Sequence, residues 1–462
     1  MYNGGQGMKA AFHTLGCKVN QYETEAMAGK FREAGYEIID EREFADVYII
    51  NTCTVTAVAD KKSRQYIRRM KKVNPDSIIA VTGCYAQIKP EEVSAVDGVD
   101  IVAGTNEKSR LTEYVSRFIS EGRKQVHIKG YEELDSYEET GTVTSTENRT
   151  RAYIKIQEGC NRFCSYCVIP YARGMVRSRE LSDIVEEARK LISAGYKEIV
   201  LTGINTALYE MESAGGSVRS CALQSEAPYG VERVIAELER LKGDFRIRLS
   251  SLEPAVVNAE YVARLLKYDR LCHHLHLSAQ SGSSRILGAM NRPYDREEYL
   301  DIVRVLREHD PHYGISTDVI VGFPGEKEKD LEESLRLTEE CAFCKTHVFK
   351  YSKRPFTRAA DMKGHVSPQI KNIRSDRMQE AGRKAAEAFF RSCVGLEQKV
   401  LFEEMDESKG VITGYTGNYI RVYVRYEDED EARGLLNSFG NVRLTGLAAE
   451  GMTAEITDRR IS

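Results

Sequence analysis

The run Cys160-Asn-Arg-Phe-Cys164-Ser-Tyr-Cys167 places three cysteines at a C-x3-C-x2-C spacing. Three thiolates at this spacing can bind three irons of a 4Fe–4S cluster and leave the fourth iron without a protein ligand. The usual ferredoxin and zinc spacings supply a fourth protein ligand and so complete the site. An iron without a protein ligand indicates a cluster with a catalytic role rather than a purely structural one. The alternative interpretation is three unrelated cysteines that pack in a core.

The residues around this run, from about 151 to 365, repeat a strand pattern followed by a helix pattern. Such alternation predicts parallel strands, and six repeats predict a partial (β/α)6 barrel. A polar stretch with several Gly and Ser, Met211–Gly230, interrupts the pattern and is predicted to be a surface loop or insertion. The six predicted strands are Tyr153–Gln157, Glu198–Thr202, Arg246–Leu249, His274–Leu277, Ser316–Val321 and His347–Phe349.

The residues before the barrel, 8–130, alternate short β-branched runs with amphipathic stretches, which predicts an open parallel α/β sheet domain. Its predicted strands are Ala10–Thr14, Val47–Ile50 and Ile78–Thr82, and its predicted helices are Asn20–Ala34 and Ala57–Val73. A polar linker, 131–150, without apolar periodicity joins this domain to the barrel.

The residues after the barrel begin with a basic-flanked connecting helix, 366–394. Strand-like segments then run through 395–460, including Val411–Ile412 and Tyr419–Tyr426. They predict a small β-barrel. The fold class is therefore α/β, with an all-β domain at its C-terminal end.

Cys17, Cys53 and Cys84 form a second candidate triad. Each lies just past the carboxyl end of a predicted strand in the first domain. Ligands gather at the carboxyl ends of parallel strands, so three thiols there could converge on one cluster. The alternative is three buried cysteines that pack as small apolar side chains.

The composition bounds the class of protein. The 462-residue chain has 11 cysteines, a net charge of −4, 42% apolar and 29% charged residues, which is ordinary for a soluble globular protein. No apolar run reaches the ~20 residues of a membrane span, and no signal peptide is visible. We therefore expect a cytoplasmic protein with no membrane partner, whose cysteines bind metal rather than form disulfides.

The helix predicted at Ala57–Val73 is strongly basic, with seven cations and one acid between residues 60 and 72. Such a cluster suggests phosphate binding, although a solvated helix face is the common alternative. The candidate RNA-binding cations are Lys61, Lys62, Arg68, Arg69 and Lys72.

Four stretches resemble the motifs of the radical S-adenosylmethionine (SAM) methylthiotransferase family. They are His13–Gln21, Asn51–Val55 and Val81–Gln87, which contain the second triad, and Cys160–Arg179, which contains the first. The resemblance covers residues 8–457. The sequence Gly16-Cys-Lys-Val-Asn-Gln21 is most similar to the motif of the branch that acts on threonylcarbamoyl-adenosine in tRNA. In the branch that acts on isopentenyl-adenosine, the motif is usually Gly-Cys-Gln-Met-Asn.

The resemblance implies two 4Fe–4S clusters. Cys160, Cys164 and Cys167 would hold the cluster whose open iron binds SAM, and Cys17, Cys53 and Cys84 an auxiliary cluster. A 5′-deoxyadenosyl radical from SAM would then take hydrogen from C2 of the adenine next to the anticodon, and a methylthio group would be added there. The implied partners are the anticodon stem-loop of tRNA, a flavodoxin- or ferredoxin-type electron donor and a sulfur source.

The resemblance also places residues near SAM, although a role in a turn or in supporting a neighbour is an equal alternative for each. Ser352-Lys-Arg-Pro-Phe356-Thr departs from the family pattern, with Phe where Gly is usual. The residues predicted to bind the cofactor are Tyr166, Thr202, Gly203, Asn205, Ser251, Gln280, Ser281, Asp318 and Ile320.

The C-terminal barrel resembles the TRAM domain, an RNA-binding β-barrel. Its Tyr415 and Tyr419 could stack on unpaired bases, or could be residues of a hairpin turn. The nearest alternative function is a methylthiotransferase that modifies an aspartate of a ribosomal protein, because that enzyme shares both triads. The isopentenyl-adenosine enzyme and a non-catalytic RNA-binding protein with structural metal are further alternatives.

Overall fold

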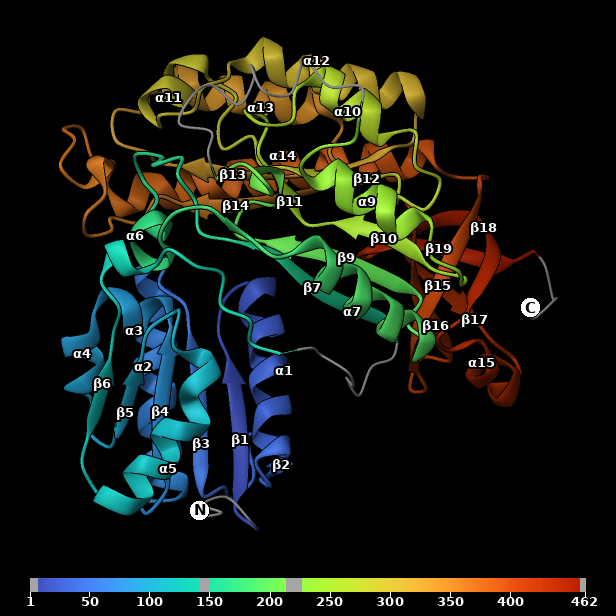
Figure 1. Cartoon of the computed structure of the whole chain (residues 1–462). Coiled ribbons are helices and arrows are strands. Elements are labelled where there is room, and N and C mark those ends of the chain that lie inside the picture. Colours follow the sequence, from blue (N-terminus) through green and yellow to red (C-terminus); the bar gives the residue numbers. More distant parts are fainter. Residues whose placement is uncertain (1–6, 142–149, 213–226, 458–462) are drawn as a thin grey trace.

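The computed structural model describes residues 7–141, 150–212 and 227–457. The first part is the predicted open parallel sheet, and it has six strands in the order β2-β1-β3-β4-β5-β6 (Figure 1). The strands are β1 (Lys9–Thr14), β2 (Glu37–Ile39), β3 (Val47–Thr52), β4 (Ile78–Gly83), β5 (Ile101–Ala103) and β6 (Gln125–His127).

Helices cover both faces of this sheet, which explains the continuous apolar runs of β3 and β4. One core joins the sheet to α2, α3 and α4, and another joins the opposite face to α1 and α5. The predicted helix Ala57–Val73 is α2, and the observed α1 begins two residues before its predicted start. The helices are α1 (Lys18–Glu33), α2 (Ala57–Val73), α3 (Cys84–Ile88), α4 (Pro90–Ser94) and α5 (Leu111–Glu121).

The central part contains the six predicted parallel strands in chain order, in two four-stranded sheets. A parallel bridge between Ile247 and Leu271 joins these sheets, so the strands form one open partial barrel. The strands are β7 (Arg151–Glu158), β8 (Arg177–Ser178), β9 (Glu198–Gly203), β10 (Arg246–Leu249), β11 (Ser251–Leu252), β12 (His274–Leu277), β13 (Gly314–Val321) and β14 (Lys345–Lys350).

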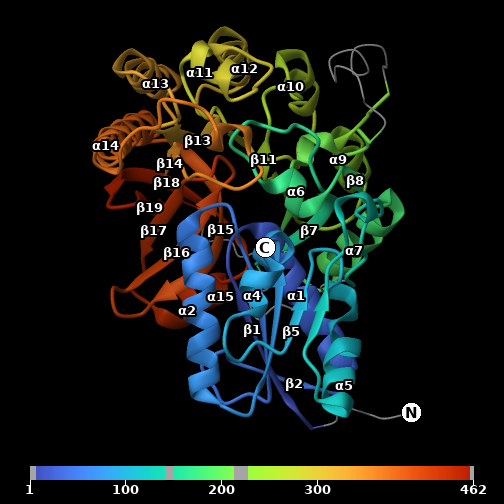
Figure 2. The ribbon, with the colours of Figure 1, turned by 90° about the vertical axis from the view of Figure 1, so that its left-hand side faces the viewer.

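Helices pack against these strands to form the largest apolar core of the described residues. In both views the N-terminal sheet lies beneath the central strands, and α6 lies at the junction (Figures 1 and 2). The helices are α6 (Ile169–Arg173), α7 (Leu181–Ser193), α9 (Val231–Glu239), α10 (Ala259–Leu265), α11 (Ser284–Ala289), α12 (Arg296–His309) and α13 (Glu328–Cys341).

The C-terminal part is a closed five-stranded barrel, β15-β16-β17-β19-β18, which confirms the predicted small β-barrel. The long helix α14 (Pro368–Ser392) leads into it, and α15 (Glu429–Leu435) follows β17. The strands are β15 (Glu397–Asp406), β16 (Val411–Thr416), β17 (Arg421–Arg425), β18 (Phe439–Ala448) and β19 (Gly451–Ile456).

Residues 131–141 of the predicted linker pack against both neighbouring parts. Tyr137 donates a hydrogen bond to the carbonyl of Lys155 at 2.9 Å, and the carboxylate of Glu138 accepts one from the amide of Ser109 at 2.8 Å. The polar composition of this stretch did not reveal these contacts, because they depend on the partners that the fold brings near.

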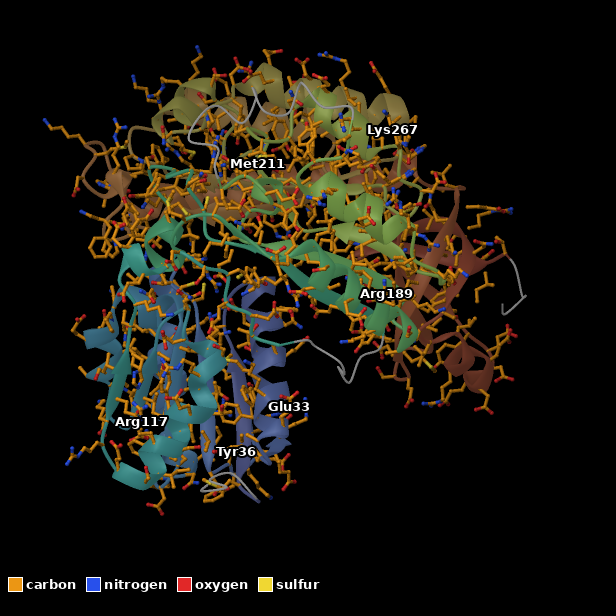
Figure 3. The ribbon with its side chains drawn as sticks, in the orientation of Figure 1. Glu33, Tyr36, Arg117, Arg189, Met211 and Lys267 are labelled. Atoms are coloured by element: carbon orange, nitrogen blue, oxygen red, sulfur yellow. The ribbon has the colours of Figure 1, made fainter. Side chains whose placement is uncertain are left out.

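Two features bear on the remaining predictions. Most of the predicted loop at 211–230 lies outside the described residues, although Met211 at its start is buried (Figure 3). Within the described ranges, no helix combines the length and the apolar character needed to cross a membrane.

Candidate functional site

The second cysteine triad lies at the carboxyl edge of the N-terminal sheet, on three neighbouring strands. Cys17 follows β1 and caps α1, Cys53 follows β3, and Cys84 follows β4 as the first residue of α3. Cys53 and Cys84 are buried and Cys17 is exposed. Burial, and then the neighbouring thiols of Cys84 and Cys17, raise the pKa of Cys53 to about 12, so this group stays a thiol until a metal displaces its proton.

Glycine before two of these cysteines allows the loops to approach one another. Gly16 has φ +112°, and a Cβ there would lie 2.7 Å from Cβ of Cys53. Gly83 has φ +97°, and its Cβ would lie 2.4 Å from the carbonyl oxygen of Thr52. Any larger residue would strain the backbone and push the cysteine loops apart.

Asn20 ties the first two cysteine loops together from inside the protein. Its buried amide nitrogen donates to the carbonyl of Leu15 at 2.6 Å and to the carbonyl of Thr52 at 3.0 Å. Its oxygen lies 3.8 Å from Sγ of Cys17. One side chain therefore fixes the residues that flank both Cys17 and Cys53.

Arg173, at the end of α6, extends this arrangement to the third cysteine. Its Nε donates to Sγ of Cys84 at 3.2 Å, and its Nη2 donates to Oδ1 of Asn20 at 2.7 Å. Its Nη1 contacts the carboxylates of Glu23 at 2.7 Å and Glu158 at 2.5 Å. The guanidinium is fully buried, so these bonds act in a low-dielectric environment where they are strong.

The charges around Arg173 favour an anionic partner. Lys155 and Lys108 also pair with Glu23, and Lys155 pairs with Glu158 as well. This buried group thus holds three cations and two carboxylates. Burial opposes ionisation of Glu23, but Arg173, Lys108 and Lys155 lower its pKa well below the ordinary value. The surplus positive charge next to Cys84 suits a thiolate ligand.

The first cysteine triad lies on the loop between β7 and α6. Gly159 starts this loop with φ +72°, and a Cβ there would lie 1.7 Å from the carbonyl oxygen of Met175. The amide of Cys160 bonds the carbonyl of Gly174 at 3.0 Å, and the amide of Cys167 bonds that of Cys164 at 2.9 Å. Burial raises the pKa of Cys167 to about 12, with the Cys164 thiol adding to the effect.

Both triads fit iron–sulfur clusters by the chemistry of their donors. Each consists of three thiols, the soft ligands that hold iron–sulfur clusters in proteins. In the described part of the chain, no three Cys, His, Asp or Glu side chains are arranged to hold a single metal ion.

A hydrogen-bonded chain connects the first triad to the strand ends. Arg292 donates to the hydroxyl of Tyr166 at 2.8 Å and to Glu253 at 2.6 Å. Glu253 accepts a bond from the side chain of Asn205 at 2.6 Å. Arg292 and Glu253 therefore link Tyr166 to Asn205, two of the residues predicted to bind SAM. Arg292 itself lies in no recognised motif, so the sequence did not reveal its role.

The remaining predicted SAM residues lie at the ends of the barrel strands. Thr202 and Gly203 are the last residues of β9. Ser251 is the first residue of β11, and its side chain is exposed. Gln280 has φ +64° and bridges to β13, because its amide bonds the carbonyl of Asp318 and its carbonyl accepts from the amide of Ile320. Ser281 is buried, and its hydroxyl lies 3.4 Å from that of Ser334.

The five candidate RNA-binding cations on α2 are all exposed, and none forms an ion pair with a described residue. Two other cations of this helix are engaged within the protein: Arg64 contacts Tyr85 and Glu92, and Lys71 donates to the carbonyl of Ser77. The exposed cations, Lys61, Lys62, Arg68, Arg69 and Lys72, thus stay free for an external anion.

Tyr415 and Tyr419 lie where the C-terminal barrel meets the central part, and both are half-buried. Their rings stack on each other with centroids 5.0 Å apart. The guanidinium of Arg151 lies over Tyr415 and that of Arg248 lies over Tyr419, at 4.8 Å and 4.7 Å. Both rings therefore have protein partners, and their RNA binding stays a prediction.

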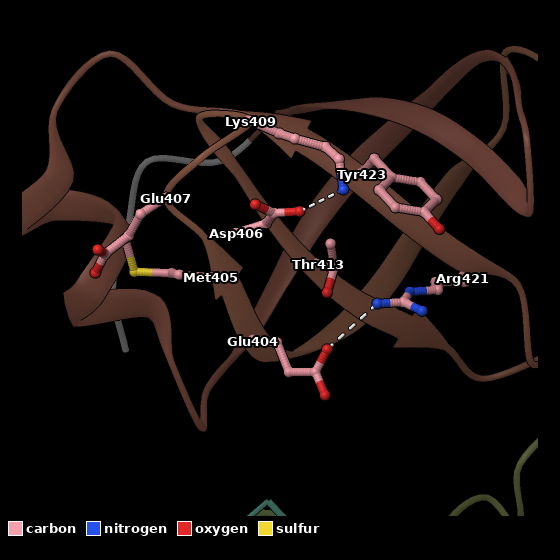
Figure 4. A pocket seen from close by; sticks show the side chains of 8 residues that line it. All are labelled: Glu404, Met405, Asp406, Glu407, Lys409, Thr413, Arg421 and Tyr423. Carbon is pink, nitrogen blue, oxygen red and sulfur yellow. Dashed lines mark hydrogen bonds and ion pairs between the residues drawn. The ribbon is translucent and has the colours of Figure 1, made fainter.

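A shallow pocket of about 480 Å³ lies on the C-terminal barrel (Figure 4). Its cations are paired with its acids: Lys409 contacts Asp406 at 2.6 Å and Arg421 contacts Glu404 at 3.2 Å. None of the predicted site residues lines it. The lining residues are Glu404, Met405, Asp406, Glu407, Lys409, Thr413, Arg421 and Tyr423.

Comparison with known proteins agrees with this arrangement. Residues 9–104 match the family described as "Uncharacterized protein family UPF0004", and residues 154–338 match the "Radical SAM superfamily". The threonylcarbamoyladenosine tRNA methylthiotransferase MtaB of Bacillus subtilis is 42% identical over 89% of this chain and 89% of its own length. A tRNA-2-methylthio-N(6)-dimethylallyladenosine synthase of Clostridium tetani is 35% identical over 87% of each chain.

A solved structure shares the fold. The radical S-adenosylmethionine methyltransferase TsrM of Kitasatospora setae superposes with a TM-score of 0.53 and 17% identity, over 76% of this chain and 77% of that chain. At this identity the likeness concerns the arrangement of the helices and strands alone.

Proposed function

Because this chain belongs to the radical SAM methylthiotransferase family, we propose that it adds a methylthio group to C2 of threonylcarbamoyl-adenosine next to the anticodon of tRNA. Membership of the radical SAM superfamily implies the use of SAM and a 4Fe–4S cluster. The observation that carries the proposal is the pair of three-thiol groups linked by α6, whose Arg173 donates a hydrogen bond to Cys84 and lies six residues after Cys167.

In this proposal Cys160, Cys164 and Cys167 hold the cluster that binds SAM, and the other triad holds a second cluster. When bound, these groups and SAM would supply hydrogen abstraction from an unactivated carbon and the sulfur that is added, and a second SAM would supply the methyl group. The protein contributes ligation, orientation and the exclusion of water. Tyr166, Arg292 and Glu253 hold the strand ends in place beside the first triad.

The residues around the second triad hold its three loops in place. Asn20 and Arg173 fix the three cysteine loops through buried hydrogen bonds, so the thiols do not have to be ordered when the cluster binds. Exposed Cys17 leaves one side of this triad open. An open side is needed for sulfur to be added to a substrate carbon.

The tRNA partner is supported by the relatives, which are tRNA methylthiotransferases by name, and by the exposed cations of α2. The proposal also needs an electron donor of flavodoxin or ferredoxin type and a source of sulfur. Because tRNA is modified in the cytoplasm, we place the reaction there.

Nucleoside analysis of tRNA from a strain that lacks this gene tests the proposal. The 2-methylthio-threonylcarbamoyl-adenosine peak should vanish and return when the wild-type gene is restored. An unchanged peak would contradict the proposed reaction. Loss of the isopentenyl derivative, or loss of a methylthio group from a ribosomal protein, would identify the corresponding alternative instead.

A further inference from the structure

Three exposed aromatic rings form a continuous group, which we call the aromatic rim: Phe163, Tyr171 and Phe356. The ring of Phe163 lies 5.8 Å from that of Tyr171, which lies 5.9 Å from that of Phe356. Their exposed fractions are 39%, 36% and 65%. Large apolar side chains that gather at the surface indicate a contact site rather than chance exposure.

Each ring lies on a segment that contains a triad cysteine or contacts residues beside one. Phe163 lies between Cys160 and Cys164, and Tyr171 precedes Arg173 on α6. Phe356 follows Arg354, whose guanidinium contacts Thr54 at 2.5 Å and Asp60 at 2.8 Å, just past Cys53. The rim therefore brings together segments that adjoin both three-thiol sites.

The backbone holds two of these rings in an unfavourable conformation. Phe163 has φ +44° and Phe356 has φ +65°, in the left-handed region that favours glycine. Neither side chain is buried, so packing in a core does not account for a bulky residue at these positions. Strain that is kept at an exposed ring points to a functional role.

Two exposed cations lie beside one end of the rim. Lys353 and Arg358 flank Phe356, and both are exposed without an ion-pair partner among the described residues. The amide of Ala57, the first residue of the basic helix α2, bonds the hydroxyl of Ser352 at 3.3 Å. The chain as a whole is acidic, with a net charge of −4, so this concentration of cations is local.

We propose that the aromatic rim stacks the unpaired nucleotides next to the target adenosine of the substrate RNA. Exposed rings combined with free cations are the pair of features that binds single-stranded nucleic acid, because every base has a π-face and every linkage a negative charge. This inference rests on the proposed function, and it names the surface that positions the RNA between the two triads.

Binding of an anticodon stem-loop RNA to the reconstituted protein tests the proposal. The RNA carries 2-aminopurine beside the target adenosine, whose fluorescence is quenched when it stacks. Phe356→Gly should weaken binding about 10-fold and remove the quenching, whereas Phe356→Tyr should stay within about 2-fold of wild type. Glycine is compatible with φ +65°, so this variant should fold; Tyr171→Leu is the second variant and should behave in the same way.

Salt dependence separates stacking from charge. Phe356→Gly should leave the slope of log Kd against log salt unchanged, because a lost stacking contact releases no counterions. Phe44→Ala is the matched control: Phe44 is 60% exposed and lies before β3, at the opposite end of the sheet from the cysteines. It should change neither affinity nor quenching.

One result would overturn the inference: Phe356→Gly and Tyr171→Leu both bind the RNA as wild type does. Slower reduction of these variants by the electron donor would then assign the rim to a protein partner. If the wild-type protein modifies the RNA and this result is found, only this inference fails. If the wild-type protein does not modify the RNA, the proposed function fails.

Discussion

Nη2 of Arg173 donates a 2.7 Å hydrogen bond to Oδ1 of Asn20, and the two residues are 153 positions apart in the chain. Asn20 holds the loops of Cys17 and Cys53, while Arg173 bonds Cys84 directly. A residue of the central part thus completes the environment of a triad that belongs to the N-terminal sheet. The second three-thiol site is built by both parts together.

Arg173→Lys keeps the positive charge but cannot bond Cys84, Asn20 and the two carboxylates at once. We expect methylthiolation to fall about 10-fold or more, the loss typical of residues that support metal ligands. The reduction potential of the proposed second cluster should also fall, because a hydrogen bond to a ligand sulfur favours the reduced state. Potentiometric titration followed by electron paramagnetic resonance measures this shift.

Arg189→Lys is the control for that experiment. Arg189 lies on α7, and its guanidinium is 56% exposed and pairs only with Glu186 among the described residues (Figure 3). It should leave the potential and the activity unchanged. An Arg173→Lys protein with the wild-type potential would show that the bond to Cys84 has no electronic effect.

Replacing one cysteine of each triad should separate the two sites. Reconstituted wild-type protein should contain about eight irons per chain, and either variant about four. Cys164→Ala should abolish the formation of 5′-deoxyadenosine from SAM. Cys53→Ala should retain that formation and lose methylthiolation. Cys272→Ala, a buried cysteine outside both triads, is the control; tRNA thiolation by Cys53→Ala would refute the second cluster.

Acid should weaken the contact between the central part and the C-terminal barrel. Burial opposes ionisation of Glu198, but Arg248, Arg246 and Arg151 lower its pKa well below the ordinary value. A depressed carboxyl pKa contributes stability above the unfolded pKa, and this stability is lost as the pH falls through the folded pKa. Arg246 and Arg248 also donate to carbonyls of the barrel, including that of Tyr415 at 3.0 Å, and Arg151 pairs with the carboxylate of Glu403.

Thermal unfolding at pH values from about 7 to about 3 measures this effect. Glu198→Gln should lower stability at neutral pH by about 3–5 kcal/mol, because it leaves buried arginines unpaired, and should flatten the acid loss. Glu186→Gln, at an exposed pair, should change stability by less than about 1 kcal/mol. Equal acid sensitivity of Glu198→Gln and wild type would place the origin of the loss elsewhere.

The exposed face of α2 should set the salt dependence of RNA binding. Each phosphate contact removed from a single strand lowers the slope of log Kd against log salt by about 0.7. Replacing Lys61, Arg68 and Lys72 by Gln should therefore weaken binding at low salt and reduce the slope. Arg117→Gln on α5 (Figure 3), an exposed cation paired with Glu113, is the control. A slope unchanged in the triple variant would exclude this helix from the interface.

The strands and the positions of the six cysteines could be predicted from the sequence because their signals are local. A β-branched run followed by Gly and Cys, as at 78–84, predicts both a strand and the loop that follows it. The parallel order of the strands then places the loops of Cys17, Cys53 and Cys84 at one edge, whatever the details of packing.

The contacts that shape the site could not be predicted, because they join residues distant in the chain. Arg173 lay inside a recognised motif, but only the packing of α6 against α3 shows that it reaches Cys84. Arg292 lay outside every motif. The sequence predicted Tyr415 and Tyr419 to be turn or RNA-binding residues. Their contacts with Arg151 and Arg248 of the central part could not be predicted, because they depend on how the barrel packs in three dimensions.

The buried charges between the two cysteine sites have a consequence for how this protein can be rearranged. Glu23 of the N-terminal sheet is paired with Arg173 and Lys155 of the central part, all out of contact with water. A chimera that takes one part from a relative with different partners would leave an unmatched charge inside. The N-terminal sheet and the central part must therefore be exchanged together, so that the partners of each buried charge stay matched.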